Sequence, residues 1–529
     1  MNETSGATAQ LFHNRTKYVY VDTGHEADNI LMGAPPELGP AMGEQNPALE
    51  PFPFKRYTSL DSIPLPEAPL ETRLPALEAI STLMGKPGDA AVIDVSMLGT
   101  LLLRTAGLLK EWTNPSGKTW HFRAAGCTGA RYHLELYAVT GDLNGLSAGV
   151  YHYDPRDHSL RQLREGDYRG AAVEATGNLP AAAQAPVLFV CTSEFWRNAW
   201  RYQERAYRHT WWDLGTLAAN LLALSASMEL PAQALMGFAD GQVNQLIGVD
   251  GEQEAALAVF AIGRTSASSP ATTDPLAPLH YTVTPSSSRE LAFPDIQRMH
   301  RASSLQSGEQ AARWRSDPLR RSLPEPQGQL IDLAPMTPGE LPNESVEEVI
   351  VRRRSNRNYA VDEPLPFESF STVLAYGAAP APADAIDPAA TSLADLYLIV
   401  NNVEGLTPGK YLLHRDLNAI ELLEAGDFRD GATSLACGQD YAGDAHVNVY
   451  LLADLVPILA HYGDRGYRLA QFEAALTGGR IQLAAHALHL GAVGSTSADD
   501  DVSAFFAPHA EGKSFMFVAV FGVRRKREP

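Results

Sequence analysis

Cysteine is scarce in this chain of 529 residues: Cys127, Cys191 and Cys437 stand far apart, with no Cys-x-x-Cys spacing. Three separated thiols cannot build the disulfide framework of a small secreted domain. The simplest expectation is a reducing compartment, and hence a cytoplasmic protein.

Long apolar runs are missing as well. No window approaches the roughly 18 apolar residues that a membrane-spanning helix needs. The N-terminal stretch MNETSGATAQLFHNRTKYVYVD has neither the basic region nor the apolar region of a signal peptide. We therefore expect no membrane partner.

Basic residues are outnumbered, with 42 Lys and Arg against 62 Asp and Glu, which gives a net charge of −20. So acidic a surface argues against nucleic acid as a partner. The hydrophobic content of 45% supplies ample core and excludes a disordered chain. The length suggests about three to four domains, or two large ones.

Several nucleotide-binding and hydrolase motifs are also absent. The chain has no G-x-G-x-x-G, no Walker A and no G-x-S-x-G pattern, which excludes dinucleotide-fold, P-loop and serine-hydrolase interpretations. His486 and His489 have a helical metal-ligand spacing but no evident third ligand. We expect no metal site.

The chain does contain an internal repeat at an offset of 260. Three pairs of similar segments, with one member in each half of the chain, share this offset. The closing segments of the two halves match at an offset of 259. The matched pairs are Glu135–Tyr137 with Asp395–Tyr397, the hairpins from Gly145 and Gly405, Tyr202-x-x-Arg205-x-Tyr207-Arg208 with Tyr462-x-x-Arg465-x-Tyr467-Arg468, and the endings at Gly263 and Gly522.

Each repeat predicts short aromatic-rich strands joined by a Gly- and Pro-containing turn, then a long helix and a closing strand. This pattern indicates an α+β fold, and two similar halves are expected to pack as an intramolecular pseudo-dimer. We predict an extended arm over 1–70, a first domain over 71–265 (unit one), a linker with a helical segment over 266–345, and a second domain over 346–529 (unit two).

The units differ in two complementary ways. Unit two opens with Arg352-Arg353-Arg354-Ser355-Asn356-Arg357, a run of forked donors suited to phosphate, which unit one lacks near 82–87. Unit one has the small-residue loop Arg123–Ala130, where unit two has AIDPAATS. Taken alone, the arginine run is explained as a solvent-exposed face, and the small-residue loop as an ordinary turn. Together, their reciprocal loss predicts that two symmetric sites became one.

These residues resemble the nitroreductase superfamily over nearly the whole chain, and within it the tandem SagB-type (thiazole/oxazole-forming azoline dehydrogenase-like) branch. RRSNRNY is similar to the family's Arg-x-Ser-x-Arg motif, and RAAGCTGARYHLELY to its Pro-Ser-Ala-Gly loop and strand. SAGVYHYDPRDHSL and YQERAYRHTWWDLG resemble its hairpin and the start of its long helix. FHNRTKYVY followed by PFPFKRY resembles the leader of tandem members.

The resemblance implies one FMN at the interface of the units, with hydride transfer at the flavin N5. Arg353, Arg354, Ser355 and Arg357 would hold the phosphate and ribityl side, together with Arg525 and Lys526. Val493, Gly494 and Ser495 would face the N5 edge. The loop residues Arg123, Gly126, Cys127, Thr128 and Gly129 would cover the ring.

Two positions depart from the family pattern. The loop has Gly126-Cys127 where Pro-Ser is usual, and the family's catalytic Lys-Tyr pair is Arg201-Tyr202 in unit one and His461-Tyr462 in unit two. An arginine cannot act as a base at neutral pH. Tyr202 is thus either an acid/base or a buried, hydrogen-bonded tyrosine, and the aromatic stretch 195–212 is either core or a wall facing the flavin.

The first functional hypothesis is an FMN-dependent SagB-type oxidoreductase that oxidises a small-molecule or peptide-like substrate, with oxygen as acceptor. A second is an NAD(P)H-dependent reductase of nitro, quinone or enone compounds. A third is an FMN-binding partner subunit without turnover. The assembly is expected to be a monomeric pseudo-dimer or a homodimer of it.

Overall fold

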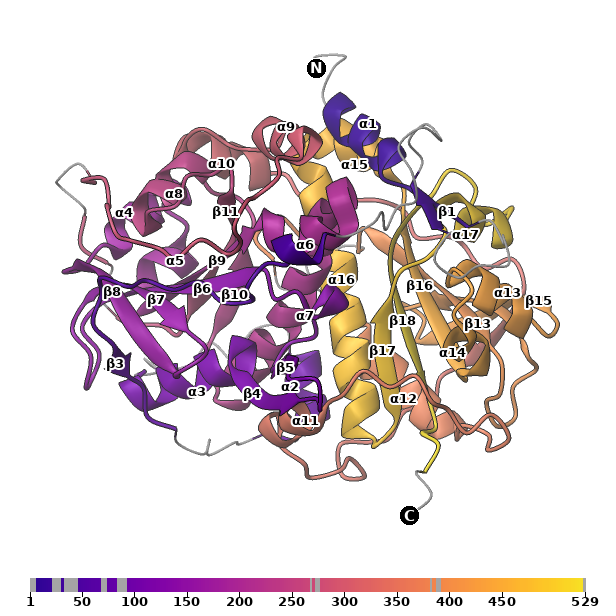
Figure 1. Cartoon of the computed structure of the whole chain (residues 1–529). Coiled ribbons are helices and arrows are strands. Elements are labelled where there is room, and N and C mark those ends of the chain that lie inside the picture. The colour runs from indigo at the N-terminus through magenta and orange to yellow at the C-terminus, as the bar shows by residue number, and fades with distance from the viewer. Residues whose placement is uncertain are drawn as a thin grey trace.

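A computed structural model of the chain describes residues 6–20, 30–32, 46–67, 74–82, 93–266, 269–271, 276–380, 383–386 and 392–526. The segment of unit one expected to match the arginine run lies almost wholly outside these residues. Within them, two halves stand side by side, each built on one sheet (Figure 1).

Each half contains a seven-stranded sheet in which all neighbouring strands are antiparallel. The first has the order β10 (Ala232–Leu235), β11 (Glu254–Ile262), β9 (Val187–Glu194), β6 (Leu134–Thr140), β7 (Gly149–Asp154), β8 (Ser159–Glu165) and β3 (Ile63–Pro64). The second has the order β12 (Gln329–Asp332), β15 (Ala419–Ala425), β14 (Gly409–His414), β13 (Ala394–Val400), β16 (Val447–Ala453), β18 (Ser514–Gly522) and β17 (Gly491–Ser495).

The two orders are the same when one is read backwards, so the structure bears out the predicted tandem α+β fold. The ladders also test the register of the closing strands. Val190 of β9 pairs with Val259, and Tyr450 of β16 pairs with Val518. Since β9 and β16 correspond at an offset of 260, the closing strands correspond at 259, as the sequence predicts.

Helices cover both sheets. Those of unit one are α2 (Ala76–Ser81), α3 (Val95–Ala106), α4 (Arg169–Ala175), α5 (Pro180–Gln184), α6 (Phe195–Tyr202), α7 (Ala206–Ser227) and α8 (Asp240–Ile247). Those of unit two are α11 (Val346–Arg352), α12 (Phe367–Gly377), α13 (Arg429–Leu435), α14 (Asp440–Asp444), α15 (Leu455–Tyr462), α16 (Arg465–Ala487) and α17 (Asp499–Phe505).

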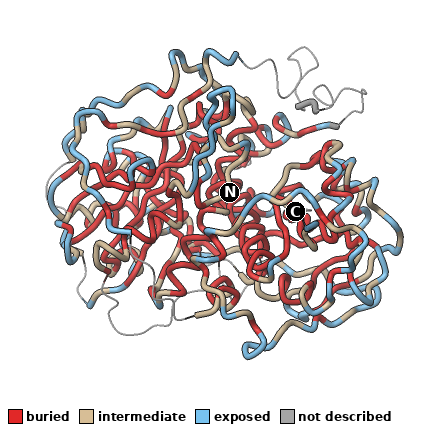
Figure 2. The backbone as a smooth tube through the Cα atoms, turned by 60° about the horizontal axis from the view of Figure 1, so that its bottom comes forward, coloured by how far each residue is buried: buried red, intermediate tan, exposed pale blue. Residues whose placement is uncertain are grey.

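The long helices α7 and α16 pack against each other at the junction of the halves (Figure 1). A Cβ atom on Gly215 would lie 2.5 Å from the Cβ of Ala475, and one on Gly479 would lie 3.0 Å from the Cβ of Ala219. Small residues at the crossing thus let the two backbones approach closely. Buried backbone runs through both halves and across this junction, with exposed segments outside (Figure 2).

The segments predicted as arm and linker contain equivalent elements. The arm holds α1 (Ala7–Arg15), β1 (Tyr18–Tyr20), which pairs with β2 (Ile30–Met32), and the edge strand β3. The linker holds α9 (Pro294–Ala302), α10 (Gly308–Arg315) and the edge strand β12. Each sheet therefore takes its last strand from the segment that precedes its own unit.

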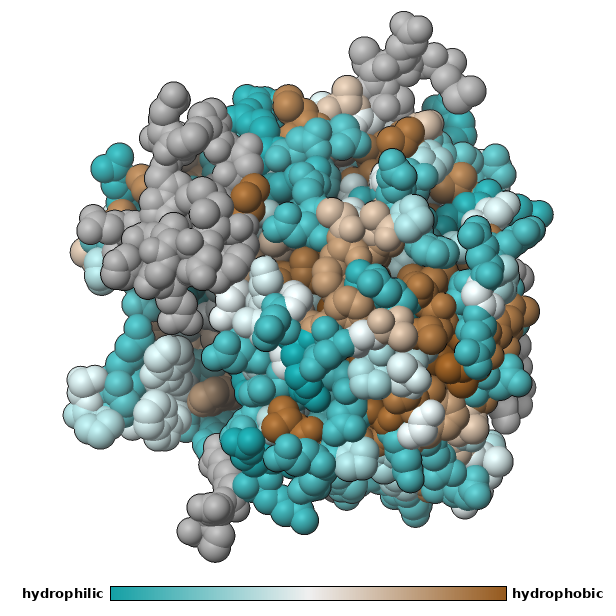
Figure 3. Space-filling view, turned by 90° about the vertical axis from the view of Figure 1, so that its right-hand side faces the viewer, coloured by the Kyte–Doolittle hydropathy of each residue, from teal (hydrophilic) through white to brown (hydrophobic). Residues whose placement is uncertain are grey.

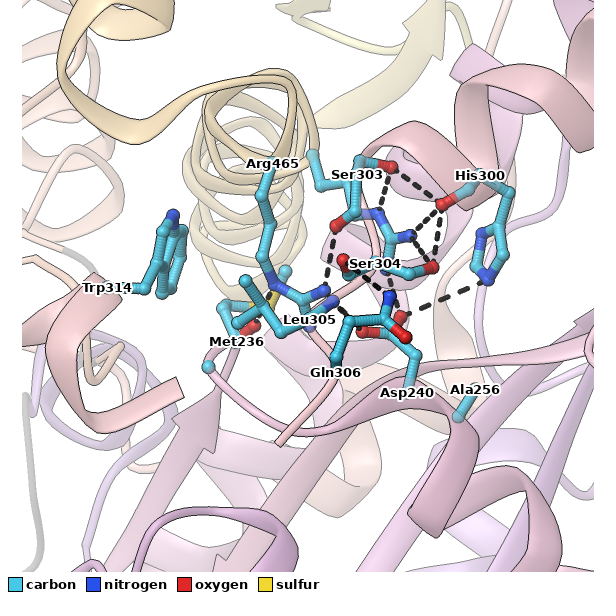
Figure 4. A network of polar contacts seen from close by, with 12 residues as sticks. Met236, Asp240, Ala256, His300, Ser303, Ser304, Leu305, Gln306, Trp314 and Arg465 are labelled. Carbon is cyan, nitrogen blue, oxygen red and sulfur yellow. Dashed lines mark hydrogen bonds and ion pairs between the residues drawn. The ribbon is translucent and has the colours of Figure 1, made fainter. Parts of the chain in front are cut away.

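A buried ion-pair cluster, the Asp240 clamp, fixes α9 across the junction (Figure 4). Asp240 accepts hydrogen bonds from Arg465 and Arg468 of the other unit, both at 2.6 Å. Arg468 also donates to the Ser303 hydroxyl and the His300 carbonyl, each at 2.7 Å.

The same arrangement recurs in the other half as the Asp499 clamp. Asp499 pairs with Arg205 at 2.7 Å and also with Arg208. Arg208 donates to the Thr16 hydroxyl at 2.9 Å and to the His13 carbonyl at 2.5 Å. The helices α1 and α9 are therefore structural counterparts. Each is held by an arginine of the unit that follows it in the chain, and that arginine is paired with an aspartate of the other unit.

The hairpin of β4 (Leu108–Thr113) and β5 (Thr119–Arg123) has no counterpart among the strands described for unit two. It was not expected from the sequence. The outer face of unit two is largely hydrophilic, with scattered apolar residues (Figure 3). Among the described residues, every helix is too short or too polar to cross a bilayer.

Candidate functional site

The arginine run of unit two and the small-residue loop of unit one meet in the structure. Arg353 follows α11, and its guanidinium donates to the backbone carbonyl of Ala124 at 3.3 Å. A Cβ on Gly126 would lie 3.6 Å from Arg353 Nη1. The arginine run and the loop, although far apart in the sequence, therefore lie together at the junction of the units.

Among the described residues, the five cations predicted to hold a phosphate lack acidic partners. Arg353 is half-buried, its Nε has no hydrogen-bond partner, and burial lowers its pKa. Within the described part of the chain, no carboxylate forms an ion pair with Arg353, Arg354, Arg357, Arg525 or Lys526. Unpaired cations gathered in a protein of net charge −20 make a site suited to a phosphate.

Within this cluster the side chains differ in orientation. Arg354 Nη1 turns back to the carbonyls of Val351 and Arg353, at 2.8 and 2.7 Å. The Arg357 guanidinium lies 5.4 Å from the centre of the Tyr441 ring. Arg525 joins the cluster through its backbone N–H, which donates to Asn358 at 3.1 Å, and Lys526 follows it, exposed.

The strand β17 borders the cluster. Ser355 forms a bridge with Ala492, the residue before Val493, and the Ser495 hydroxyl lies 2.5 Å from the Tyr441 hydroxyl. A Cβ on Gly494 would lie 2.8 Å from the Phe517 ring. The three predicted residues Val493–Ser495 therefore stand beside the arginine run.

A hydrogen-bond network holds the loop of unit one. Asp213 of α7 accepts from the Thr128 backbone N–H at 2.9 Å, from the Thr128 hydroxyl at 2.8 Å and from the Cys127 thiol at 3.0 Å. His133 Nε2 lies 2.8 Å from the same carboxylate. Burial and Asp213 raise the pKa of Cys127, so the thiol is a neutral donor.

Cys127, His133 and Asp213 bring three potential metal-ligand atoms within 4.8 Å of one another. Hydrogen bonds explain the cluster, because the carboxylate joins the thiol to the imidazole and His133 Nδ1 lies 2.8 Å from the Ser193 hydroxyl. The cluster serves as the anchor of the loop.

Tyr202 packs on the same loop. Gly129 has a φ of +61°, and a Cβ there would lie 2.4 Å from the Tyr202 hydroxyl, so only glycine fits. The Arg201 guanidinium lies 5.6 Å from the centre of the Tyr202 ring. Burial raises the Tyr202 pKa, which keeps its hydroxyl protonated at neutral pH.

The Arg123 side chain points away from the contact between Arg353 and the loop. Its guanidinium donates to the carbonyls of Pro53 and Leu134, at 2.5 and 3.4 Å, and lies 4.8 Å from the centre of the Phe54 ring. Its side chain thus ties the arm to unit one. Of the predicted loop residues, Gly126–Gly129 remain at the junction with Arg353.

The repeat relates this candidate site to an equivalent position in the other half of the pseudo-dimer, which we call the twin position. There, the backbone N–H groups are bound by a side chain of the protein itself. Leu235 pairs with the closing strand as Ser495 does, so Met236 and Gly237 correspond to Thr496 and Ser497. The backbone N–H groups of Met236 and Gly237 donate to Asp384 of unit two at 2.7 and 3.1 Å. Among the described residues, no carboxylate accepts from the backbone N–H of Thr496 or Ser497. Sequence reasoning missed Asp384, which lies just before the compared AIDPAATS segment.

The tyrosines at the two positions also differ. Tyr462, the counterpart of Tyr202, donates to the Ala385 carbonyl at 2.9 Å and accepts from the Leu319 N–H at 2.7 Å. Its hydroxyl is therefore fully used within the protein. Tyr462 is thus a buried, hydrogen-bonded tyrosine, whereas Tyr202 faces the loop.

The profile of the nitroreductase family matches residues 103–264 and 350–522, once in each unit. The chain belongs to the nitroreductase family. Proteins of this family generally bind FMN. A half-buried guanidinium without an acidic partner among the described residues, beside a glycine, fits the phosphate of that cofactor.

Among known nitroreductase relatives, the trifolitoxin-processing protein TfxB of Rhizobium leguminosarum bv. trifolii is 32% identical over 171 residues, which are 31% of this chain and 46% of that protein. The match thus spans less than half of that relative. A protein of Methanocaldococcus jannaschii named as a nitroreductase is 24% identical over 143 residues, 27% of this chain and 71% of that one.

The tandem arrangement is shared with a solved structure. A crystal structure from Anabaena variabilis ATCC 29413, named as a nitroreductase, covers 98% of this chain and is itself covered to 99%. The two are 25% identical, with a TM-score of 0.72. Both nitroreductase units and their leading segments thus recur together in one other chain.

Proposed function

We propose that this protein is an FMN-dependent oxidoreductase of the SagB type with a single flavin site between its two units. The observation that carries the proposal is the contact of Arg353 with the Ala124 carbonyl, because it joins the phosphate-type cluster of one unit to the loop of the other. The filling of the twin position by Asp384 supports one site and not two.

Arg353 and Arg357 would hold the phosphate side, assisted by Ser355, Arg525 and Lys526. FMN held there would supply the transfer of a hydride to or from its N5. The backbone of Gly126–Gly129 would limit water on one side of the ring. These assignments follow the family motif residue by residue.

Tyr202 is the residue best placed to hold or release a proton. Its hydroxyl lies at Gly129 on the loop, and its raised pKa makes it a donor. Arg201 remains a cation beside it, because a guanidinium does not lose its proton at neutral pH. It would position Tyr202 and stabilise developing negative charge on the hydroxyl oxygen.

The substrate class we propose is a peptide-like or small-molecule substrate, oxidised in the cytoplasm with oxygen as the acceptor. TfxB, whose name assigns it to trifolitoxin processing, supports a role in peptide modification. The two units supply both parts of the site, so a monomer suffices.

The test is anaerobic mixing of the purified holoprotein with NADH, NADPH and candidate azoline-containing peptides, followed by admission of oxygen. Reduction of the flavin by a peptide, and reoxidation by oxygen, is the expected result. Rapid bleaching by NAD(P)H alone would instead indicate a nitro, quinone or enone reductase. A flavin inert to all of them would indicate a partner subunit without turnover.

A further inference from the structure

Two buried polar side chains near Tyr202 have atoms without partners. The Tyr18 hydroxyl of the arm and His209 Nε2 of α7 are both buried, and neither has a hydrogen-bond partner among the described residues. Native proteins rarely leave such groups unsatisfied, so each calls for an explanation.

Both side chains border the same region. The Arg205 guanidinium lies 3.7 Å from the centre of the Tyr18 ring and 5.5 Å from that of Trp212. The His209 ring lies 5.0 Å from Trp212 and 4.6 Å from Tyr202, centre to centre. The Tyr18 and His209 side chains therefore belong to one aromatic cluster that adjoins the loop at Gly129 through Tyr202.

At the twin position, the residues equivalent to Tyr18 and His209 are both apolar. Tyr18 and Leu305 are counterparts, because their backbone N–H groups donate to Asp499 and Asp240 at 2.7 and 2.8 Å. Their side chains differ, a phenol against an aliphatic chain. His209 corresponds in the same way to Leu469, at the offset of 260.

This difference between the two halves matches the difference between the candidate site and its twin position. The half with the unpaired arginines has Tyr18 and His209, and the half filled by Asp384 has leucines. A purely structural role, such as holding the arm, would require similar residues in both halves, because the two clamps are otherwise alike. The polar pair therefore accompanies the function of the site.

The neighbours of His209 define which hydrogen-bond role is left open. Asn198 Nδ2 donates to the Thr128 carbonyl at 3.3 Å, which turns its Oδ1 toward His209 Nδ1, 3.0 Å away. An oxygen acceptor there places the proton on Nδ1 and a lone pair on Nε2. Burial, and after it Arg205, lowers the His209 pKa and keeps the ring neutral.

The Tyr18 hydroxyl has the hydrogen-bond role opposite to that of His209 Nε2, because it is a donor. Burial raises the pKa of its hydroxyl, so the phenol keeps its proton and is a donor. Arg205 packs on its ring and is itself held by Asp499, which fixes the position of the ring. One free donor and one free acceptor thus border the same aromatic region.

We propose that Tyr18 and His209 bind the substrate, and that they recognise a planar carboxamide. The Tyr18 hydroxyl donates to the amide oxygen, and His209 Nε2 accepts from the amide N–H. The aromatic rings of Tyr202 and Trp212 suit a flat group. This inference rests on the proposed function for the reaction that the bound amide undergoes, but the binding itself needs no turnover.

The test is isothermal titration of the FMN-loaded protein with benzamide and with acetophenone, which differ only by NH₂ against CH₃. The wild-type protein is expected to bind benzamide about tenfold more tightly, as befits one hydrogen bond to a buried acceptor. His209→Leu, which installs the residue of the twin position, should abolish this preference. Tyr18→Phe should weaken both ligands equally.

Tyr411→Phe in β14, a buried tyrosine of the other sheet, is the matched control and should change neither affinity. His209→Gln, which keeps an acceptor, serves if the leucine variant fails to fold, and it should retain part of the preference. An equal affinity for both ligands in the wild type, or an unchanged preference in a folded His209→Leu protein, would overturn the proposal.

Two sources could supply such an amide, a peptide-like substrate or the nicotinamide group of a dinucleotide cofactor. N-methylbenzamide, a secondary amide, represents the first, and nicotinamide mononucleotide the second. Selective binding of either to a protein that proves unable to hold FMN would keep this inference and reject the proposed function. Full FMN content with no selectivity would do the reverse.

Discussion

The carboxylate of Asp384 accepts a hydrogen bond from the backbone N–H of Met236 at 2.7 Å, across the junction of the two units. Met236 occupies the place in unit one that Thr496 occupies in unit two, directly after the strand that borders the unpaired arginines. The two halves of this nitroreductase-family chain thus share a fold and differ at the position where a ligand would lie.

Asp384→Ala should therefore cost stability without creating a second site. The N–H groups of Met236 and Gly237 would lose their acceptor, and two unsatisfied buried donors cost about 2–5 kcal/mol together. Urea unfolding of the variant should show this loss. Asp384→Asn, which keeps one acceptor oxygen, is the milder control, and a gain of flavin in either variant would contradict the account.

Arg353→Gln should raise the dissociation constant for FMN by about 10- to 100-fold, because a charged hydrogen bond to phosphate is lost. Arg354→Gln is the matched control, since the Arg354 side chain already donates to the Val351 carbonyl. We expect a distinctly smaller effect there. Fluorescence titration of flavin into the apoprotein measures both, and equal effects would argue against a special role for Arg353.

Gly129→Ala should displace Tyr202, because the added Cβ would lie 2.4 Å from its hydroxyl. The expected result is a loss of flavin reduction by substrate of tenfold or more, with lowered FMN retention. Gly117→Ala is a strict comparison: Gly117 also has a positive φ, +85°, but no atom lies within 4 Å of its Cβ position. That variant should lose about 1 kcal/mol of stability and no activity.

The clamps predict a loss of stability in acid. Burial alone would raise the Asp240 pKa, but Arg465 and Arg468 lower it to about 2. Since the folded value lies below the unfolded value of about 4, the contribution is complete above pH 4 and is lost as the pH falls toward 2. Asp499 has the same pKa of about 2, again because its arginines outweigh burial.

Asp240→Asn should accordingly lower the free energy of unfolding by about 3–5 kcal/mol at pH 7, since it leaves two buried arginines short of a partner. The difference from the wild type should shrink as the pH approaches 2. Glu252→Gln, which breaks the exposed pair with Arg301, should cost less than about 1 kcal/mol at either pH. A pH-independent difference for Asp240→Asn would contradict this explanation.

The repeat in the sequence predicted most of the fold, because the strands and the long helices keep recognisable residues at an offset of 260. The leading segments escaped detection for a physical reason. The clamps use backbone groups of α1 and α9, such as the carbonyls of His13 and His300. Backbone contacts constrain side-chain identity weakly, so only the structure reveals the correspondence.

The candidate site was partly predictable in the same sense. The joining of Arg353 to the loop follows from the reciprocal loss of the two motifs. Tyr18 and His209 carried no such signal, because their importance depends on packing between an arm and a helix nearly 200 residues apart. Arg123 was assigned to the ring-covering loop by its sequence position, but its side chain points toward the arm.

The most direct test of the central claim is the number of flavins in the purified protein. Its visible absorption spectrum, with the released flavin identified and counted per chain, gives that number after reconstitution with FMN. One FMN per chain is the predicted result. Two per chain would contradict the assignment of Asp384 as the group that fills the twin position, and none would contradict the flavin site itself.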